Sequence, residues 1–348
     1  MFQEIQNRLL AGILALPRPF LSILAGRPVR IDGQTLDTQV QLVLRVVALA
    51  SVPNLEDCTP EQARCAYDDF VTAMTGPERM MGKVEGRTIV GPDGTIAIRV
   101  YTPGTPARPL PLIVYFHGGG WVIGDLDSHD RPLRVMADEA GAIVVAVDYR
   151  LAPEHRFPAA YDDCLAATRW VFSHGTSLGG DPARVALAGD SAGGNLVAAV
   201  TQGLHAAGDP SPVLQWLIYP VTDLGAETES YKLFEDGFFL TSRAMRWYKH
   251  HYLNNDEAAA LDSRASPLRA PELAGLSPAL VQTAGFDPLR DEGRAYAERL
   301  LDAGVDVDYR NYPGLIHGYI SMGGAIDAAR EAISDGIMAL RKAFEREA

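Results

Sequence analysis

The sequence predicts an α/β protein with a mostly parallel, eight-stranded sheet and helices on both faces. Two observations lead to this prediction. From residue 84 onward, short apolar runs of strand length alternate with longer segments of helical periodicity. Several of these runs are followed at once by glycine, histidine, serine or aspartate. Strands joined by helices pair in parallel, and functional groups of such sheets gather beyond the carboxyl ends of the strands.

The elements can be assigned in chain order from residue 84. Eight segments have the pattern of strands: residues 84–91, 95–101, 112–116, 142–147, 185–188, 213–219, 279–284 and 305–312. Helical character is expected at residues 128–140, 159–174, 195–200, 290–303 and 325–344. We expect Ser128 to cap the first of these helices and Gly304 to end the fourth.

Two regions do not follow this alternation. Residues 1–82 are predicted to be helical and irregular, with one helix at 38–49 and another opened by Thr59 and Pro60. A signal peptide is the competing interpretation of the apolar stretch from Leu9 to Leu24. Glu4, the interruption at Pro17-Arg18-Pro19 and the lack of an Ala-x-Ala site favour amphipathic turns instead. Residues 221–277 break the alternation a second time.

Composition narrows the classes of function. The chain has 348 residues and a net charge of −13, which argues against binding nucleic acid or anionic membranes by charge. The apolar N-terminal run is too short and broken for a membrane span, so no stable membrane insertion is expected. Cys58, Cys65 and Cys164 lack metal-ligand spacing and are interpreted as reduced thiols of a cytoplasmic protein. No metal and no cofactor is expected.

The stretch around Ser191 has the pattern of a Gly-x-Ser-x-Gly nucleophile elbow. An apolar strand leads into Gly189-Asp190-Ser191-Ala192-Gly193, and a helical segment follows. This context places the serine hydroxyl above the end of the sheet, beside a helix N-terminus whose free N–H groups favour negative charge. The competing interpretation is a tight turn with an inert serine, so the motif alone does not establish a nucleophile.

A serine nucleophile needs a base and an acid that orients the base. His317 follows the last predicted strand, and Asp287 follows the strand before it, so the order Ser, Asp, His is that of an α/β-hydrolase triad. Asp291 and Glu292 remain alternatives if Asp287 is only a turn or a helix cap. Six other histidines are expected to be surface or structural residues: His129, His155, His174, His205, His250 and His251.

The remaining catalytic requirement is a set of donors for the oxyanion. His117-Gly118-Gly119-Gly120 follows the strand at 112–116, and its glycines let the backbone present N–H groups without obstruction by a Cβ atom. A second donor is expected from Ala192, directly after the nucleophile. His117 is expected to shape this loop and not to act as a base.

Together these motifs resemble those of the hormone-sensitive-lipase-like family of α/β-hydrolase esterases, over about residues 84–345. The resemblance rests on His117-Gly-Gly-Gly-Trp121, Asp148-Tyr-Arg-Leu-Ala-Pro-Glu-His155, Gly189-Asp-Ser-Ala-Gly-Gly194, Asp287-Pro-Leu-Arg-Asp-Glu292 and Ile316-His-Gly318. It implies an α/β-hydrolase fold with a triad of Ser191, Asp287 and His317. It also implies an oxyanion hole from the N–H groups of Gly118, Gly119 and Ala192. One departure is Tyr319, where the family usually has phenylalanine.

The resemblance also implies a division of the chain. Residues 1–82 would form an N-terminal cap segment and residues 221–277 a cap insertion, around a catalytic domain built from residues 83–220 and 278–348. Dimers formed through the edge of the last strand are common in this family, so a homodimer is compatible with the sequence, which leaves the oligomeric state open. Binding proteins share this fold, but the complete catalytic set favours an enzyme.

The expected substrates are short- to medium-chain carboxylic esters, which the resemblance places at roughly two to eight acyl carbons. Trp121, Phe238, Phe239 and Leu240 are candidates for closing the acyl or alcohol pocket. Ordinary packing of the cap onto the sheet is an equally good explanation for these side chains. Amidase or deacetylase activity remains the alternative, since the same triad cleaves both kinds of bond.

Overall fold

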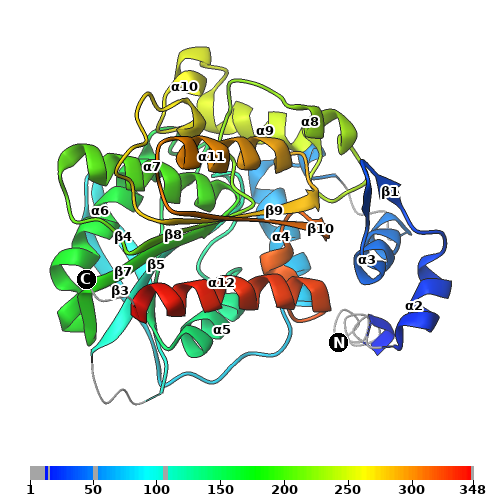
Figure 1. Cartoon of the computed structure of the whole chain (residues 1–348), viewed down its shortest axis with the longest axis horizontal. Helices are drawn as coiled ribbons and strands as arrows, with labels where there is room; N and C mark the ends of the chain where they lie inside the picture. Colours follow the sequence, from blue (N-terminus) through cyan, green and yellow to red (C-terminus); the bar gives the residue numbers. More distant parts are fainter. Residues whose placement is uncertain (1–11, 15, 50–53, 105–108, 346–348) are drawn as a thin grey trace.

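The computed structural model of the chain describes residues 12–14, 16–49, 54–104 and 109–345. An eight-stranded sheet runs through its centre in the order β3-β4-β6-β5-β7-β8-β9-β10 (Figure 1). The pairs β3–β4 and β4–β6 are antiparallel, and all other pairs in this sheet are parallel. The mostly parallel sheet predicted from the alternation of elements is confirmed.

The strands lie close to their predicted positions. They are β3 (Lys83–Gly91), β4 (Gly94–Thr102), β5 (Leu110–Phe116), β6 (Ile143–Asp148), β7 (Gly180–Asp190), β8 (Leu214–Ile218), β9 (Ala279–Phe286) and β10 (Val307–Ile316). The largest difference is at the start of β7. There, Gly180 already pairs with Leu110 of β5 before a register shift, so the strand begins well ahead of the apolar run that signals it.

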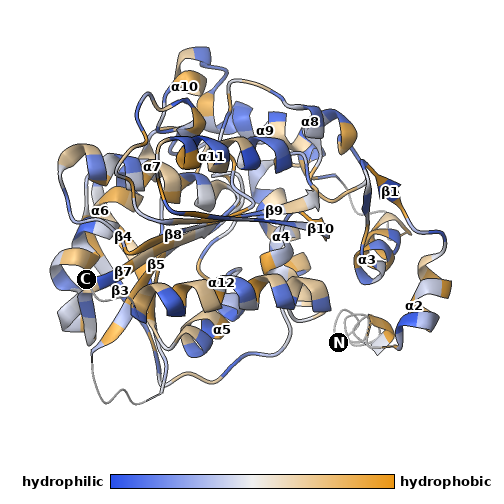
Figure 2. Cartoon of the chain, in the orientation of Figure 1, coloured by the Kyte–Doolittle hydropathy of each residue, from blue (hydrophilic) through white to orange (hydrophobic). Residues whose placement is uncertain are grey.

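Helices cover both faces of the sheet. Figure 1 shows α6 (Ala159–His174), α7 (Ala192–Ala207) and α11 (Arg290–Asp302) on one face, with α5 (Asp130–Ala140) and α12 (Asp327–Glu345) on the other. Successive side chains of a strand point to opposite faces. Val114 and Leu187 accordingly belong to one buried cluster, and Ile113 and Ala186 to the other. The central strands are therefore apolar on both sides, and Figure 2 shows mostly hydrophobic colours along β5 and β7.

Two further groups of helices lie outside this layered core. The N-terminal group is α2 (Arg18–Ala25), the hairpin β1 (Arg30–Ile31) and β2 (Gln34–Thr35), α3 (Thr38–Leu49), η1 (Leu55–Asp57) and α4 (Pro60–Met74). The segment between β8 and β9 holds α8 (Glu229–Leu233), α9 (Ser242–Leu253), α10 (Glu257–Leu261) and η3 (Pro267–Arg269). The two groups touch: Phe70 of α4 stacks on Phe239, with ring centroids 4.6 Å apart.

Most of the expected helix signals are present. Thr59 and Gln62 form a capping box at the start of α4, and Gly304, with φ 81°, follows the end of α11. The expectation for Ser128 is wrong. Helix α5 has His129 at its N-cap position without a side-chain cap, and the Ser128 hydroxyl instead closes a turn with the backbone of Asp125. The remaining short helices are η2 (Gly175–Leu178) and η4 (Tyr319–Met322).

The apolar N-terminal stretch is only partly described, because residues 9–11 and 15 lie outside the described residues. In the described part, Leu21 and Ala25 of α2 are buried, while Phe20 and Ile23 are exposed. Over all described residues, none of the helices combines the length and the apolar character that a bilayer crossing requires.

Candidate active site

The candidate nucleophile lies at a sharp turn between strand β7 and helix α7. Ser191 has φ 55° and ψ −117°, a conformation that L-amino acids rarely adopt. The turn can close because Gly193 approaches the end of β5, where an added Cβ would overlap the carbonyl oxygen of Phe116. The Ser191 amide donates to the carbonyl oxygen of Ile218 at 2.8 Å. The local geometry is therefore that of a strand–turn–helix nucleophile elbow.

Ser191, His317 and Asp287 are brought into one hydrogen-bonded row. The Ser191 Oγ lies 2.9 Å from Nε2 of His317, and Nδ1 of His317 lies 2.8 Å from Oδ2 of Asp287. The tautomer with its proton on Nδ1 can donate to the Asp287 carboxylate and leaves Nε2 to accept from the serine hydroxyl. All three side chains are buried, with exposed fractions of 8%, 6% and 0% for Ser191, His317 and Asp287.

The two alternative acids are engaged elsewhere. Glu292 is fully buried and accepts the amide of Thr222 at 2.7 Å. Asp291 accepts the amide of Ser230 at 3.0 Å and forms an ion pair with Arg290. Asp287 is the carboxylate that contacts His317, as its position after β9 predicts.

His117 lies beside the site, but it is not placed to act as the base. Burial lowers the pKa of His117 to about 4, so the imidazole is neutral at physiological pH. Its ring stacks on Tyr149, and Nδ1 lies 2.7 Å from the carbonyl oxygen of Gly118. Because the C=O and N–H groups of a trans peptide point in opposite directions, this contact turns the Gly119 amide away from His117.

The glycine loop differs from expectation at Gly118. The Gly118 amide donates to Oδ1 of Asp190 at 2.8 Å, so it is not free to serve the oxyanion as expected. The amides of Gly119, Gly120 and Ala192 have no acceptor within the described part of the chain. Gly119 has φ 115°, and an added Cβ would overlap the carbonyl oxygen of Ile123. These three amides are therefore unpaired donors, two of them in the loop after β5 and one directly after Ser191.

Sequence reasoning missed two residues next to the site. Asp190, adjacent to the serine, is 3% exposed and lies 3.3 Å from Nε2 of His129, which is 1% exposed. His129 is one of the histidines expected to be surface or structural, because it does not follow the end of a predicted strand. The polar residue types around it, from Asp125 to Asp130, gave no signal that the loop folds inward.

The structure separates the four candidate pocket residues. Trp121 is fully buried and stacks on Tyr252, with ring centroids 4.2 Å apart, and Leu240 is also buried. Phe238 contacts the rings of Phe234 and Phe286. Phe238 is partly buried, and Phe239 is the most open of the four, at 38% exposed. Phe239 lies against Gly318, which directly follows His317.

The described residues hold no group of three or more histidine, cysteine, aspartate or glutamate side chains that is arranged to bind a metal ion. Cys58, Cys65 and Cys164 are all unpaired thiols. The described side chains at this site thus place a hydroxyl, an imidazole and a carboxylate in one hydrogen-bonded row, beside a loop with unpaired backbone amides.

Known proteins share both the sequence and the fold. A family model described as alpha/beta hydrolase fold matches residues 113–321. "Carboxylic ester hydrolase LipN" of Mycobacterium tuberculosis (strain ATCC 25618 / H37Rv) is 44% identical over 330 residues, which cover 92% of this chain and 87% of the relative. "Ethyl acetate hydrolase" of Pseudomonas putida is 35% identical over 311 residues, covering 88% and 98%.

A solved structure agrees with these relatives. The crystal structure of a thermostable esterase from Pseudomonas putida ECU1011 superposes with a TM-score of 0.86 at 39% identity, covering 90% of this chain and 98% of that one. The family match, the extent of identity and the common fold together show what the chain is. It belongs to the hormone-sensitive-lipase-like family of α/β-hydrolases and is a carboxylic ester hydrolase.

Proposed function

We propose that the chain hydrolyses short- to medium-chain carboxylic esters through a Ser191–His317–Asp287 triad and an acyl-enzyme. The single observation that carries this proposal is the row of contacts from Ser191 Oγ to His317 Nε2 and from His317 Nδ1 to Asp287. In this order the serine hydroxyl has a base within reach, and the base has a carboxylate that fixes its tautomer.

The reaction follows from these contacts. Nε2 of His317 takes the proton of Ser191 as Oγ attacks the ester carbonyl, and Asp287 stabilises the imidazolium that forms. The amides of Gly119, Gly120 and Ala192 are the proposed oxyanion donors. The imidazolium then protonates the departing alcohol. In the second half His317 takes a proton from water, which attacks the acyl-enzyme, and the acid leaves as Ser191 recovers its proton.

The substrate range is supported by the surroundings of Phe239. Its ring lies against Gly318 and stacks on Phe70, so the approach to His317 is narrowed from two parts of the chain. Each methylene of an acyl chain gains about 0.8 kcal/mol by burial, and a clash in a filled pocket costs more. A relative named for ethyl acetate hydrolysis is consistent with small substrates. Trp121, Phe238 and Leu240 have mainly packing roles in this proposal.

One set of assays tests the triad and the substrate class. The purified chain and its Ser191→Ala variant are compared on p-nitrophenyl esters from acetate to palmitate and on matched p-nitroanilides. Activity on the shorter esters should fall by several orders of magnitude in the variant, with an unchanged melting temperature. A Ser191→Ala variant that keeps more than a few per cent of the wild-type kcat would contradict the assignment of Ser191 as the nucleophile. Maximal activity on the palmitate ester would contradict the proposed preference for short to medium acyl chains. Faster cleavage of the anilides than of the esters would favour an amidase.

A further inference from the structure

A buried carboxylate lies directly beneath the oxyanion loop and takes no part in the triad. Oδ1 of Asp190 accepts the Tyr115 hydroxyl at 2.7 Å and the Gly118 amide at 2.8 Å. Oδ2 accepts the Tyr219 hydroxyl at 3.4 Å. Asp190 directly precedes the proposed nucleophile, and its side chain is thus hydrogen-bonded to the glycine loop. A fully buried anion is costly unless nearby groups compensate its charge, and the hydroxyls and amide are neutral donors.

His129 is the basic side chain that lies against this carboxylate. Its Nε2 lies 3.3 Å from Oδ1 of Asp190, at the distance of an ion pair. Its Nδ1 lies 3.1 Å from the Ser128 hydroxyl. That hydroxyl contacts both the amide and the carbonyl of Asp125, at 2.9 and 3.0 Å, so the ring is anchored at Nδ1, while Nε2 faces Asp190 without hydrogen-bond geometry.

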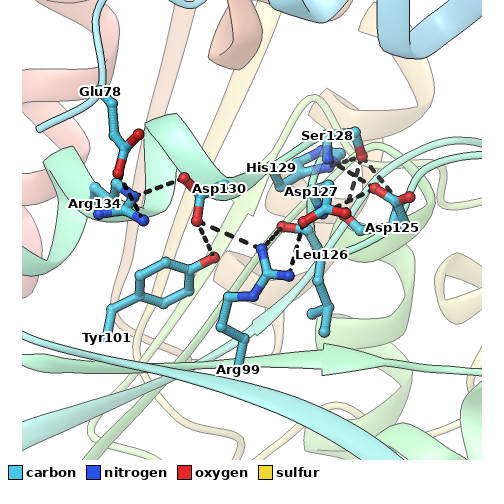
Figure 3. Close-up of polar contacts among 10 residues, drawn as sticks. All are labelled: Glu78, Arg99, Tyr101, Asp125, Leu126, Asp127, Ser128, His129, Asp130 and Arg134. Atoms are coloured by element: carbon cyan, nitrogen blue, oxygen red, sulfur yellow. Dashed lines mark hydrogen bonds and ion pairs between the residues drawn. The ribbon is translucent and has the colours of Figure 1, made fainter. Parts of the chain in front are cut away.

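The loop that carries His129 is itself fixed to the sheet. Arg99 of β4 donates to the carbonyl oxygen of Leu126 at 2.9 Å and to the carboxylate of Asp127 at 2.7 Å (Figure 3). The carboxylate of Asp125 accepts the amides of Asp127 and Ser128. Figure 3 shows these contacts on both sides of the turn that presents His129. The position of the imidazole is therefore determined by several bonds and not by packing alone.

We propose that His129 is a positioning residue, which holds the Asp190 carboxylate in the orientation that binds the Gly118 amide and so aims the neighbouring Gly119 amide at the ester oxygen. Gly118 is then held at its amide by Asp190 and at its carbonyl oxygen by His117, and this carbonyl shares a peptide plane with the Gly119 amide. Donors aimed in advance at the oxyanion stabilise the transition state more than the bound substrate. This inference rests on the proposed triad mechanism.

The charge state of Asp190 agrees with this role. Burial acts to raise the pKa of the Asp190 carboxyl, but the attraction of His129 and the hydrogen bonds outweigh it, and the pKa lies below its usual range. Asp190 is therefore an anion at neutral pH and accepts hydrogen bonds with both oxygens. Without His129, part of this compensation is lost, and a protonated Asp190 would offer a donor where the Gly118 amide needs an acceptor.

The test uses His129→Gln, Asp190→Asn and the double variant, with p-nitrophenyl butyrate as substrate. His129→Gln should lower kcat about ten- to a hundredfold, part of the loss caused by deleting an oxyanion donor, with little change in KM. The inhibition constant of a trifluoromethyl ketone should rise by a similar factor. If His129 acts through Asp190, the double variant should lose no more activity than Asp190→Asn alone.

The matched control is His174→Gln, which changes an exposed histidine at the end of α6 and should leave all constants unchanged. Wild-type kcat in a folded His129→Gln variant, a loss confined to KM, or additive losses in the double variant would overturn the proposal. If His129→Gln does not fold, Ser128→Ala removes the Nδ1 partner and should lower kcat severalfold at constant KM. Unchanged kcat and KM in the Ser128→Ala variant would also overturn the proposed role of His129. Ser191→Ala tests the triad separately, so the two proposals can fail independently.

Discussion

Glu292 offers a quantitative test of the structure, because a buried carboxyl group should make folding stability depend on pH. Its Oε1 accepts the amides of Thr222 and Asp223 at 2.7 and 3.3 Å, and the side chain is fully buried. Burial raises the pKa of Glu292 from 4.5 to about 8, and the two amide bonds oppose this shift only in part. The perturbation we consider is Glu292→Gln, which keeps an amide acceptor and removes the titrating proton.

The size and sign of the effect follow from proton linkage. Because the pKa is raised on folding, the folded protein holds this proton more tightly than the unfolded chain does. The stabilisation is complete below pH 4.5 and is lost as the pH rises through about 8. At about 1.4 kcal/mol per pKa unit, ionisation of this group in the unfolded chain lowers the free energy of unfolding by about 3 kcal/mol at pH 7, relative to acidic pH. Glu292→Gln has no such titration, so its stability relative to wild type should increase by about 4 kcal/mol between pH 5 and pH 9.

The assay is reversible urea unfolding of both proteins at pH 5, 7 and 9, with m-values compared at each pH. Glu298→Gln is the matched control, since its carboxylate lies on the same helix with the side chain 65% exposed. The control should reproduce the pH dependence of wild type. A Glu292→Gln variant whose stability difference from wild type stays constant within about 1 kcal/mol over this range would refute the reasoning.

Three further predictions concern the site. His317→Ala should reduce kcat/KM about as much as Ser191→Ala, by roughly 10⁴-fold or more, and His117→Gln should retain a larger share of activity because that ring only orients the loop; equal, total losses in folded proteins would contradict this. Phe239→Ala should raise kcat/KM for hexanoate and octanoate esters relative to acetate, and an unchanged chain-length profile would exclude this ring from the pocket. Gly193→Ala should lower both the melting temperature and activity, because the new methyl group would overlap a backbone carbonyl at the end of β5; wild-type values for both would disprove the close approach.

The sheet and the triad could be predicted because each leaves a local signal. Buried parallel strands such as β5 and β9 are apolar or mostly apolar runs, since both of their faces are covered. Ser191 and Asp287 follow such runs, His317 follows the more polar last strand, and the parallel sheet brings the ends of these strands to one edge. The sequence therefore predicts their proximity without any knowledge of the loops.

The details of the loops could not be predicted in the same way. Gly118 was expected to bind the oxyanion, but which amide of a glycine run faces the substrate depends on the orientation of each peptide plane. Here the carboxylate of Asp190 determines that orientation. The positions of His129 and Trp121 also depend on tertiary contacts. His129 is buried against Asp190, and Trp121 is buried against Tyr252. Residue type and periodicity contain no information on such long-range pairs.

The backbone conformation of Ser191 implies a trade-off between thermal stability and catalytic activity. With φ 55° and ψ −117°, the proposed nucleophile stores conformational strain on the order of 1–3 kcal/mol, which the rest of the fold must sustain. Glycine would occupy the same conformation with less strain. A Ser191→Gly variant should therefore be inactive and yet outlast the native enzyme on heating. At this position, selection for resistance to heat alone would favour an inactive protein, so the serine is retained only by selection for activity.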